Sequence, residues 1–453
     1  MLNALNSLFN ESGERVICKG LNGENLVSVK QLKTDVFFIY NRLLSNQNTR
    51  WLLSSNDPYR FLVGLLALLA AEKTVVISAN RTENWLNEIT SNFDAILSDE
   101  LGLFEFNSKE KFELNDSSPS LGERDKLNLI SFSGNESLQF FTSGSTGQAK
   151  KVKKRLFDIT NEIASLNQCF SETSRHADFL SSVSHFHIYG LLFNLFLPLL
   201  SKRYWVNTTI EFQEQLIEYT ELGRTIIFIS SPAFLSRLEV KPLNKPIAGV
   251  FSSGGPLDYK HANESYLCLG VYPIEVYGST ETGGIGYRQQ LIENHPWQTF
   301  TDIDLIECPK GIELRSNHVH ANPPIILDDK LELLDKGRFL LLGRKDRIVK
   351  LEEKRVSLNE IESFLCRSEF VSQCVALVIP GKRDVIGCVL ILTPKGKTII
   401  NSEGRLFLLL KIKSFMRSRF ESVTIPRKWR ILDCFPVDSQ GKLINSSLEK
   451  LFY

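Results

Sequence analysis

Short apolar runs recur along the first two thirds of the chain, separated by longer segments of mixed polarity. Four runs have the length of a buried strand and are rich in β-branched residues: TVVISA (74–79), TIIFIS (225–230), IAGVFSS (247–253) and PIEVYGS (273–279). The segments between them are long enough for crossover helices. Strands that alternate with helices predict an α/β fold with mostly parallel sheets flanked by helices. Ligands bind such sheets at the carboxyl ends of the strands.

Two longer apolar runs predict buried helices. Asp57 is a candidate N-cap with Pro58 in the first turn, before FLVGLLALLAA (61–71). The second run, IYGLLFNLFLPLL, covers 188–200. Both are shorter than the roughly 18 residues that a membrane-spanning helix requires, so we expect no membrane insertion.

The pattern changes near residue 343. FLLLGRKDRIVKL (339–351) predicts two strands, and SLNEIESFLC (357–366) predicts a helix whose Ser357 and Glu360 are spaced as a capping box. Strands at 374–380, 385–394 and 429–435 and a helix around 402–421 complete a small α+β module.

Length, composition and charge agree with two domains. The chain has 453 residues, of which 43% are hydrophobic and 23% charged, as in globular proteins. We expect a large N-terminal domain over 1–343 and a small C-terminal domain over 344–453. The second domain carries 21 Lys and Arg but 12 Asp and Glu on a chain whose net charge is +1. This asymmetry fits either an anionic partner or a solvated basic face.

A nucleic-acid-binding module is one hypothesis for the basic C-terminus and for KKVKKR (150–155). Aromatic residues are not interleaved with these charges, and no nucleic-acid motif is present, so we expect no such partner. The eight cysteines have no CxxC or zinc spacing, which is typical of reduced thiols in the cytosol. The N-terminal 15 residues show no signal-peptide pattern. We expect a cytoplasmic protein.

The most distinctive loop is TSGSTGQAK, from Thr142 to Lys150. It fails the Walker A pattern, because Ala149 stands where the second glycine belongs, and it fails the Rossmann GxGxxG pattern as well. Its four hydroxyls, backbone N–H groups and lysine suit polyphosphate oxygens. Taken alone, this composition suits a plain surface turn equally well.

The loop resembles the phosphate loop, TSG[ST]TGxPK, of the adenylate-forming ligase superfamily, which includes acyl- and aryl-CoA synthetases, adenylation domains and firefly-type luciferases. Other stretches resemble the family's remaining motifs in the family's order: SSGGPL (252–257), YGSTE (277–281), Asp329, GRKDRIVK (343–350) and GK (441–442). Two positions depart from the pattern. Ala149 replaces a common proline, and Leu327 and Asp328 precede Asp329 in place of Thr-Gly.

The resemblance implies an ATP site and a mobile C-terminal domain. Tyr277 would stack on adenine, and Asp329 and Arg344 would reach the ribose. The implied ATP- or AMP-binding residues are Thr142, Ser143, Gly144, Ser145, Thr146, Gly147, Lys150, Ser253, Gly254, Gly255, Tyr277, Gly278, Ser279, Asp329 and Arg344. Asp346 falls at the family's hinge, where the small domain rotates between half-reactions.

The implied chemistry joins a carboxylate to the α-phosphate of ATP, so two anions must be brought together. Lys442 would neutralise charge on both in the transition state. Thr280 would donate a hydrogen bond to the α-phosphate, and Glu281 would hold Mg²⁺, a hard ion that prefers carboxylate oxygen. His187 would line the acyl pocket or serve a structural role instead.

The resemblance implies an ATP-dependent ligase that forms an acyl- or aryl-adenylate and then passes the acyl group to a thiol. In the family a glycine three residues after the lysine of GRxDxxxK lets pantetheine pass, but here Glu353 stands three residues after Lys350. A bulky acidic side chain at this position argues against free CoA as the thiol acceptor, or implies that the pantetheine tunnel is rearranged. We therefore expect the phosphopantetheine of an acyl carrier protein as acceptor, with free CoA as the alternative.

The acid itself is not identified by the sequence. Glu353 and HIYGLLFNLFLPLL (187–200) resemble the short ligases of aryl polyene pathways, which implies an aromatic acid. We expect Gly283 and Gly284 to lie along the acyl pocket with His187. A non-catalytic adenylate- or acyl-binding protein is a further alternative.

Overall fold

The computed structural model describes residues 1–11, 13–103, 109–114, 130–143, 149–172, 177–320, 324–344, 347–351, 354–381, 384–420, 424–438 and 443–453. Gly144, Ser145, Thr146, Gly147, Asp346, Glu353 and Lys442 lie outside these residues, so their predicted roles stay predictions. The chain forms two compact units. The first contains Met1–Ile306, Glu313–Ile325 and Asp335–Arg338, and the second contains Glu307–Ile312, Ile326–Leu334 and Phe339–Tyr453. The domain boundary predicted after residue 343 stays a prediction.

One sheet of the first unit follows the order β6-β5-β3-β4-β7-β8. Its strands are β3 (Arg50–Ser54), β4 (Thr74–Ser78), β5 (Ala95–Ser98), β6 (Glu110–Glu113), β7 (Ser137–Ser143) and β8 (Ala149–Arg155). All neighbours pair parallel except β7 and β8, which are antiparallel. The parallel pairs require crossovers, and the helices that follow these strands include α3 (Pro58–Ala70) and α4 (Glu83–Ile89).

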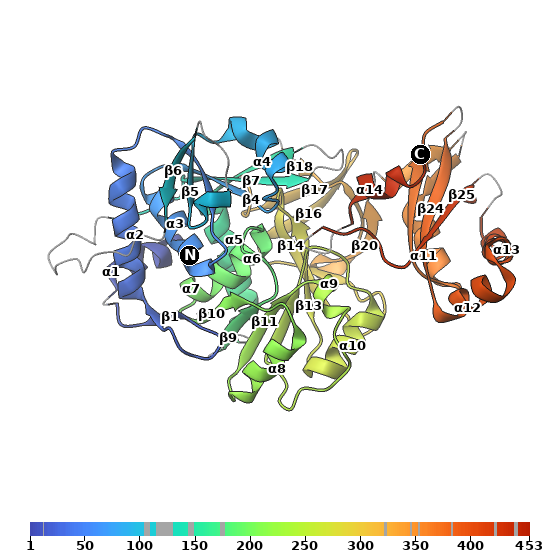
Figure 1. Ribbon diagram of the computed structural model, residues 1–453, viewed down its shortest axis with the longest axis horizontal. Helices are drawn as coiled ribbons and strands as arrows, with labels where there is room; N and C mark the ends of the chain where they lie inside the picture. The colour runs from blue at the N-terminus through green and yellow to red at the C-terminus, as the bar shows by residue number, and fades with distance from the viewer. Residues whose placement is uncertain are drawn as a thin grey trace. The chain divides into compact units, whose positions relative to one another are not determined.

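A second sheet of this unit follows the order β15-β14-β13-β12-β11-β9-β10-β1-β2 (Figure 1). Its strands are β1 (Val16–Lys19), β2 (Val27–Ser28), β9 (Asp178–Ser181), β10 (Tyr204–Thr209), β11 (Ile226–Ser230), β12 (Gly249–Ser252), β13 (Ile274–Ser279), β14 (Gly283–Gln289) and β15 (Trp297–Thr299). The strands from β13 to β1 pair parallel along the order. The predicted mostly parallel α/β fold is confirmed, and the four apolar runs form β4, β11, β12 and β13.

Helices cover the apolar faces of these strands. The remaining helices of the unit are α1 (Leu2–Asn10), α2 (Val29–Leu44), α5 (Leu156–Phe170), α6 (Ile188–Gly190), α7 (Leu197–Leu200), α8 (Gln213–Glu221), α9 (Pro232–Leu235) and α10 (Tyr259–Leu269). Leu216 of α8 and Leu269 of α10 are fully buried in one cluster with Phe228 of β11 and Val250 of β12. Burial of this apolar surface is the main stabilising contribution to the layer.

The two long apolar runs form buried helices, as predicted. Asp57 caps α3, because its Oδ1 accepts a hydrogen bond from the backbone N–H of Arg60 at 2.9 Å. The run at 188–200 is interrupted, since a π-helical turn over Leu191–Phe196 separates α6 from α7. None of the helices in the described parts of the chain has the length and apolar character that crossing a membrane requires.

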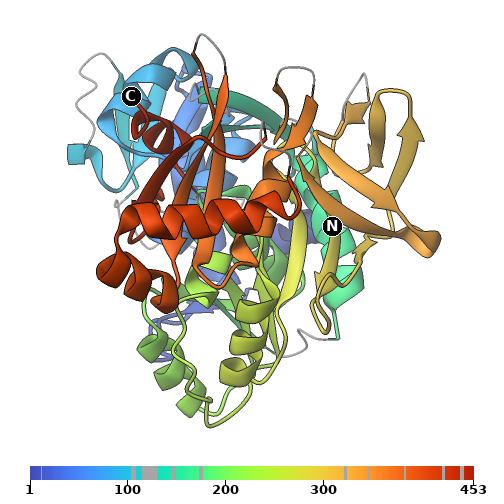
Figure 2. The same ribbon diagram turned by 90° about the vertical axis from the view of Figure 1, so that its right-hand side faces the viewer.

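The second unit contains a sheet in the order β23-β24-β25, with β23 (Val371–Ile379) antiparallel and β25 (Lys428–Leu432) parallel to β24 (Val385–Leu392). In Figure 2 the helices α12 (Pro394–Glu403) and α13 (Arg405–Arg417) lie in front of these strands. The other elements in this part of the chain are β16 (Ile303–Cys308), β17 (Gly311–Ser316), β18 (Ile325–Ile326), β19 (Asp329–Leu333), β20 (Arg338–Arg344), β21 (Ile348–Leu351), β22 (Lys354–Ser357), α11 (Leu358–Cys366) and α14 (Asn445–Lys450).

The helix predicted around 402–421 corresponds to α13. The preceding helix, α12, was not predicted, and Gly404, which has a positive φ of 86°, separates the two helices. One local prediction for this unit needs correction. The capping box of α11 is only half formed. Ser357 Oγ accepts from the N–H of Glu360 at 3.2 Å, but the Glu360 carboxylate pairs with Arg419 at 2.8 Å.

Candidate active site

The phosphate-loop motif begins and ends on paired strands. Thr142 lies opposite Lys150 in the antiparallel register of β7 and β8, and Ser143 lies opposite Ala149. The backbone N–H of Ala149 donates to Glu88 Oε1 at 2.9 Å. This contact fixes the start of β8, which carries Lys150.

The YGSTE motif forms a tight turn between β13 and β14. The N–H of Ser279 donates to Thr282 Oγ1 at 2.9 Å, and the N–H of Thr282 donates to Ser279 Oγ at 3.2 Å. These two hydroxyls close the turn from both sides, so Thr280 and Glu281 occupy its corner. Gly278 must lack a side chain, because a Cβ there would lie 2.3 Å from the carbonyl oxygen of Gly283.

The structure brings Lys150 and Glu281 into contact. Lys150 Nζ lies 2.5 Å from Glu281 Oε1, and the two side chains are 55% and 34% exposed. Burial alone would raise the pKa of Glu281. The hydrogen bonds from Lys150 and Ser279 and the charge of Lys150 outweigh it, and they hold the pKa of Glu281 below its usual value. The site therefore presents an ionised carboxylate beside a cation.

The adenine-side motif lies at the carboxyl ends of β12 and β13, which are parallel neighbours. Ser253 Oγ donates to the carbonyl oxygen of Val276 at 2.8 Å, so the glycine loop is tied to the strand that carries Tyr277. Gly254 has a φ of 90°, which side-chain-bearing residues rarely adopt. The half-buried Tyr277 ring lies 5.7 Å from the Trp297 ring, centre to centre. Gly255 and Gly278 are exposed in the same loops.

The two predicted ribose-binding residues belong to the second unit. Asp329 and Arg344 are cross-strand partners in the antiparallel pair of β19 and β20. Their backbones are therefore held side by side, as a shared ligand would require.

The histidines occupy different environments. His185 is buried, and its Nε2 lies 2.8 Å from the carbonyl oxygen of Ser55. Burial lowers the pKa of His185 to about 4, so it is neutral and structural. His187 precedes α6 and is half-buried. Gly283 and Gly284 are buried in β14.

Two functional neighbours were missed in the sequence, Lys154 and Glu162. Both lie buried beneath the YGSTE turn. Lys154 belongs to the run KKVKKR, which had suggested nucleic-acid binding, yet this run forms β8 and buries Lys154 on the same side as Val152. Alternation along a strand was the signal that could have revealed the inward lysine.

The residues present fit Mg²⁺ bound by one carboxylate together with the phosphates of the substrate. Within the described residues, no cluster of three or more His, Cys, Asp or Glu side chains could hold a metal ion. Mg²⁺ is commonly bound by one or two carboxylates together with substrate phosphates. The ionised Glu281 carboxylate suits that mode.

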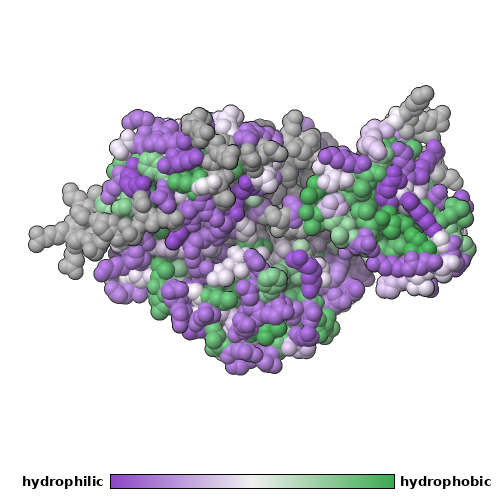
Figure 3. All heavy atoms as spheres, viewed as in Figure 1, coloured by the Kyte–Doolittle hydropathy of each residue, from purple (hydrophilic) through white to green (hydrophobic). Residues whose placement is uncertain are grey.

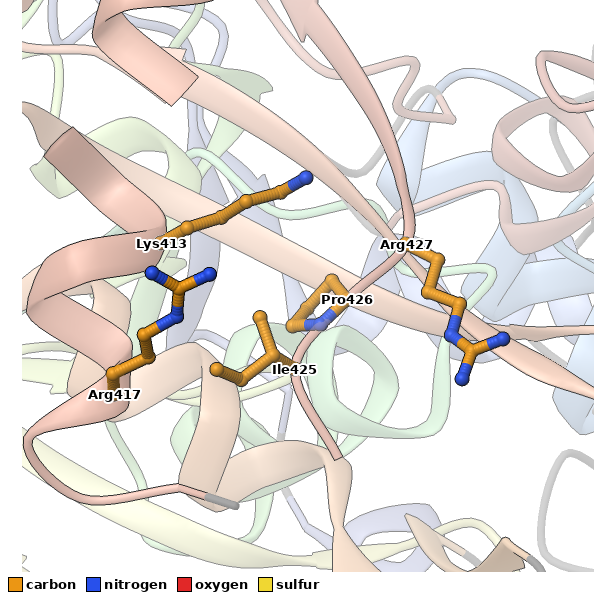
Figure 4. A pocket seen from close by; sticks show the side chains of 5 residues that line it. All are labelled: Lys413, Arg417, Ile425, Pro426 and Arg427. Carbon is orange, nitrogen blue, oxygen red and sulfur yellow. The ribbon is translucent and has the colours of Figure 1, made fainter. Parts of the chain in front are cut away.

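The second unit carries a separate cavity of about 200 Å³. It is lined by Lys413, Arg417, Ile425, Pro426 and Arg427 (Figure 4). Figure 4 shows the Arg417 guanidinium near the base of the Lys413 side chain, whose amino group points away from it. Apolar side chains also gather on this unit's surface (Figure 3). Leu406 and Leu410 of α13 are exposed.

Comparison with known proteins decides the family. The profile of the AMP-binding enzyme family matches residues 71–306, which include the loop, the glycine turn and the YGSTE turn. The chain belongs to the AMP-binding enzyme family. Its predicted membership of the adenylate-forming ligases, and with it the prediction of an enzyme, is confirmed.

Relatives of this AMP-binding enzyme cover nearly its whole length. The D-alanine–D-alanyl carrier protein ligase of Staphylococcus aureus strain MRSA252 is 23% identical over 472 residues, covering 92% of each chain. ATP-bound MatB from Rhodopseudomonas palustris has a TM-score of 0.83 at 17% identity, covering 100% of this chain and 99% of that chain. O-succinylbenzoate CoA synthetase (MenE) from Bacillus subtilis, in complex with AMP, has a TM-score of 0.77 at 17% identity, covering 96% and 95%. The two solved structures share the fold.

Proposed function

We propose that this AMP-binding enzyme uses ATP and Mg²⁺ to convert a carboxylic acid into an acyl-adenylate and then transfers the acyl group to a thiol. The observation that carries the proposal is the contact between Lys150, at the start of β8, and Glu281, at the corner of the YGSTE turn. A cation at the end of the hydroxyl-rich motif therefore contacts an ionised carboxylate of the second motif. Polyphosphate and its counter-ion need that combination.

The first half-reaction is attack of the substrate carboxylate on the α-phosphorus of ATP, with pyrophosphate as the leaving group. Lys150 and the Thr142–Gly147 loop would hold the phosphate oxygens, and Thr280 would donate to the α-phosphate. Mg²⁺ bound at Glu281 would neutralise phosphate charge. Lys442 would stabilise the charge that develops between the two anions.

The nucleoside would lie against the motifs at the ends of β12 and β13. Tyr277 is held on one side by Trp297, and Ser253 and Gly254 shape the neighbouring loop. Asp329 and Arg344 would contact the ribose hydroxyls, and Asp346 would act as the hinge. His187, Gly283 and Gly284 would border the acid.

For the second half-reaction we propose the phosphopantetheine thiol of an acyl carrier protein. The relative from Staphylococcus aureus is named as a carrier protein ligase, and the net positive charge of the second unit suits an acidic partner. Free CoA stays the alternative, and Glu353, the residue that argues against it, lies outside the described residues. The prediction of an aromatic acid stays a prediction. The eight free thiols suit a reducing, cytoplasmic location.

The function is tested by pyrophosphate release with ATP, Mg²⁺ and a panel of carboxylic acids: aliphatic acids of several lengths, benzoates, cinnamates, and D- and L-amino acids. We expect one class to respond. Silence across the panel despite ATP binding would contradict the proposal and favour a non-catalytic adenylate-binding protein.

The acceptor is tested at the cavity of the second unit. Neither Lys413 nor Arg417 forms an ion pair with another described residue. We expect Lys413→Gln/Arg417→Gln to raise the KM for a carrier protein several-fold by removing charge attraction, while adenylate formation is unchanged. The control is Lys395→Gln/Lys397→Gln on α12, where both lysines already pair with carboxylates. Equal KM values for the two variants would mean that the acceptor docks elsewhere.

A further inference from the structure

Two buried charges of opposite sign lie beneath the YGSTE turn. Lys154 of β8 is 3% exposed and Glu162 of α5 is 4% exposed. Charged side chains are rarely buried to this degree without a specific partner. Both have such partners, and most of them are backbone groups of the turn itself.

Lys154 binds the turn from below. Its Nζ donates to the carbonyl oxygen of Glu281 at 3.4 Å and to the carbonyl oxygen of His318 at 3.2 Å. Lys150, four residues earlier on the same strand, pairs with the carboxylate of Glu281. Two lysines of β8 therefore hold one residue, one through its side chain and the other through its backbone.

Glu162 binds the other end of the turn. Its Oε1 accepts a hydrogen bond from the N–H of Gly284 at 2.6 Å, a short, charge-assisted contact. Its Oε2 is buried with no hydrogen-bond partner. A Cβ on Gly283, whose φ is 68°, would lie 2.8 Å from this oxygen, so the glycine lets the carboxylate approach the backbone.

The two charges depend on each other. Asp158, the nearby carboxylate on α5, is paired with Arg155 at 2.8 Å, whereas Glu162 forms no ion pair within the described residues. Burial holds the pKa of Lys154 below its usual value, and the negative charges of Glu162, Asp158 and Glu281 oppose this lowering. Each buried charge thus compensates part of the desolvation cost of the other.

A buried histidine completes the support. His318 Nδ1 donates to the carbonyl oxygen of Gly284 at 2.9 Å, and its Nε2 lies 2.8 Å from Ser165 Oγ on α5. Both backbone groups of Gly284 are therefore bound by side chains. The turn is fixed at Glu281 by Lys154 and at Gly284 by Glu162 and His318.

We propose that Lys154 and Glu162 are positioning residues that fix the backbone from Glu281 to Gly284, and so aim the Glu281 carboxylate and Thr280 hydroxyl at the nucleotide. The C=O of residue i and the N–H of residue i+3 are the groups that a β-turn joins to each other. Here each is held by a buried charge. The inference rests on the proposed function, because it assigns Glu281 to the phosphate site.

The test separates positioning from plain stability. Lys154→Met leaves Glu162 buried and uncompensated, so it should lower the unfolding midpoint. The double variant Lys154→Met/Glu162→Met removes both charges, and such apolar replacements often restore stability. Lys153→Met is the matched control, because Lys153 is the exposed neighbour on the same strand.

The decisive readout is the Mg²⁺ concentration for half-maximal ATP binding, measured by titration calorimetry, which needs no acid substrate. We expect the double variant to regain the unfolding midpoint but to require several-fold more Mg²⁺, because the Glu281 carboxylate is no longer aimed. In pyrophosphate exchange its kcat should stay about tenfold below wild type, as small displacements at a reacting centre cause. A wild-type Mg²⁺ midpoint in the double variant would overturn the proposal.

A second pair keeps the test valid if the double variant does not fold. Glu162→Gln retains an acceptor for the N–H of Gly284, and Glu162→Met does not. We expect Glu162→Gln to keep the wild-type Mg²⁺ midpoint and Glu162→Met to raise it. Equal Mg²⁺ midpoints in these two variants would overturn the proposal. Absence of pyrophosphate exchange in the wild type, with a normal Mg²⁺ midpoint, would contradict the proposed function instead.

Discussion

Lys442→Ala is expected to lower the rate of adenylate formation about 10³-fold, the upper range for loss of a preorganised charge at a transition state. The carboxylate and the α-phosphate are both anions, and attack concentrates their charge between them. Lys150 pairs with Glu281, and the resemblance to the family assigns neutralisation of the attacking carboxylate to Lys442. The measurement is single-turnover pyrophosphate release with an acid that responds in the panel.

The control separates chemistry from binding. Lys442→Ala should bind ATP with near-normal affinity and should transfer the acyl group from a preformed adenylate to the thiol. Lys450→Ala changes the charge of the same unit at an exposed position of α14 and should have no effect. Retained pyrophosphate release in Lys442→Ala would remove the residue from the catalytic step.

Short-range sequence signals predicted much of the fold, because side-chain branching and helix capping act between residues close in sequence. β-branched runs of strand length gave β4, β11, β12 and β13, and the Asp57–Pro58 cap gave the start of α3. The helix α12, which precedes the predicted helix, was missed. Thr393 caps α12 by accepting from the N–H of Gly396 at 3.1 Å, and Gly404 ends the helix eleven residues after this cap.

The site was predictable in its motifs but not in its supporting contacts. Residues 150 and 281 are far apart in sequence, and only their motifs indicated that they bind the same ligand. The salt bridge between them is a tertiary contact that depends on the fold. Lys154 looked like one more surface lysine in KKVKKR, and Glu162 carried no motif at all. Alternation along β8 could have placed Lys154 on the inward side with Val152, but its contacts with the β13–β14 turn, and those of Glu162, depend on tertiary packing.

Glu281→Gln is expected to lower kcat for pyrophosphate exchange about 10²-fold and to raise the Mg²⁺ requirement, because a neutral amide is a poorer ligand for a hard divalent ion. Lys150 would also lose its carboxylate partner. The measurement is a Mg²⁺ titration of exchange in both proteins. Glu239→Gln is the matched control, because Glu239 pairs with Lys241 at the same 2.5 Å separation but lies outside all of the motifs.

The pH dependence sharpens this last prediction. The pKa of Glu281 lies below its usual value in the folded protein, so the carboxylate is ionised above about pH 5. Its contribution to stability is therefore present above the ordinary glutamate pKa and is lost as the pH falls through the lowered, folded-state value. The activity ratio of wild type to Glu281→Gln should stay constant from about pH 5.5 upward. A ratio that grows between pH 6 and 8 would require another titrating group to bind the ion, because Glu281 is already fully charged throughout that range.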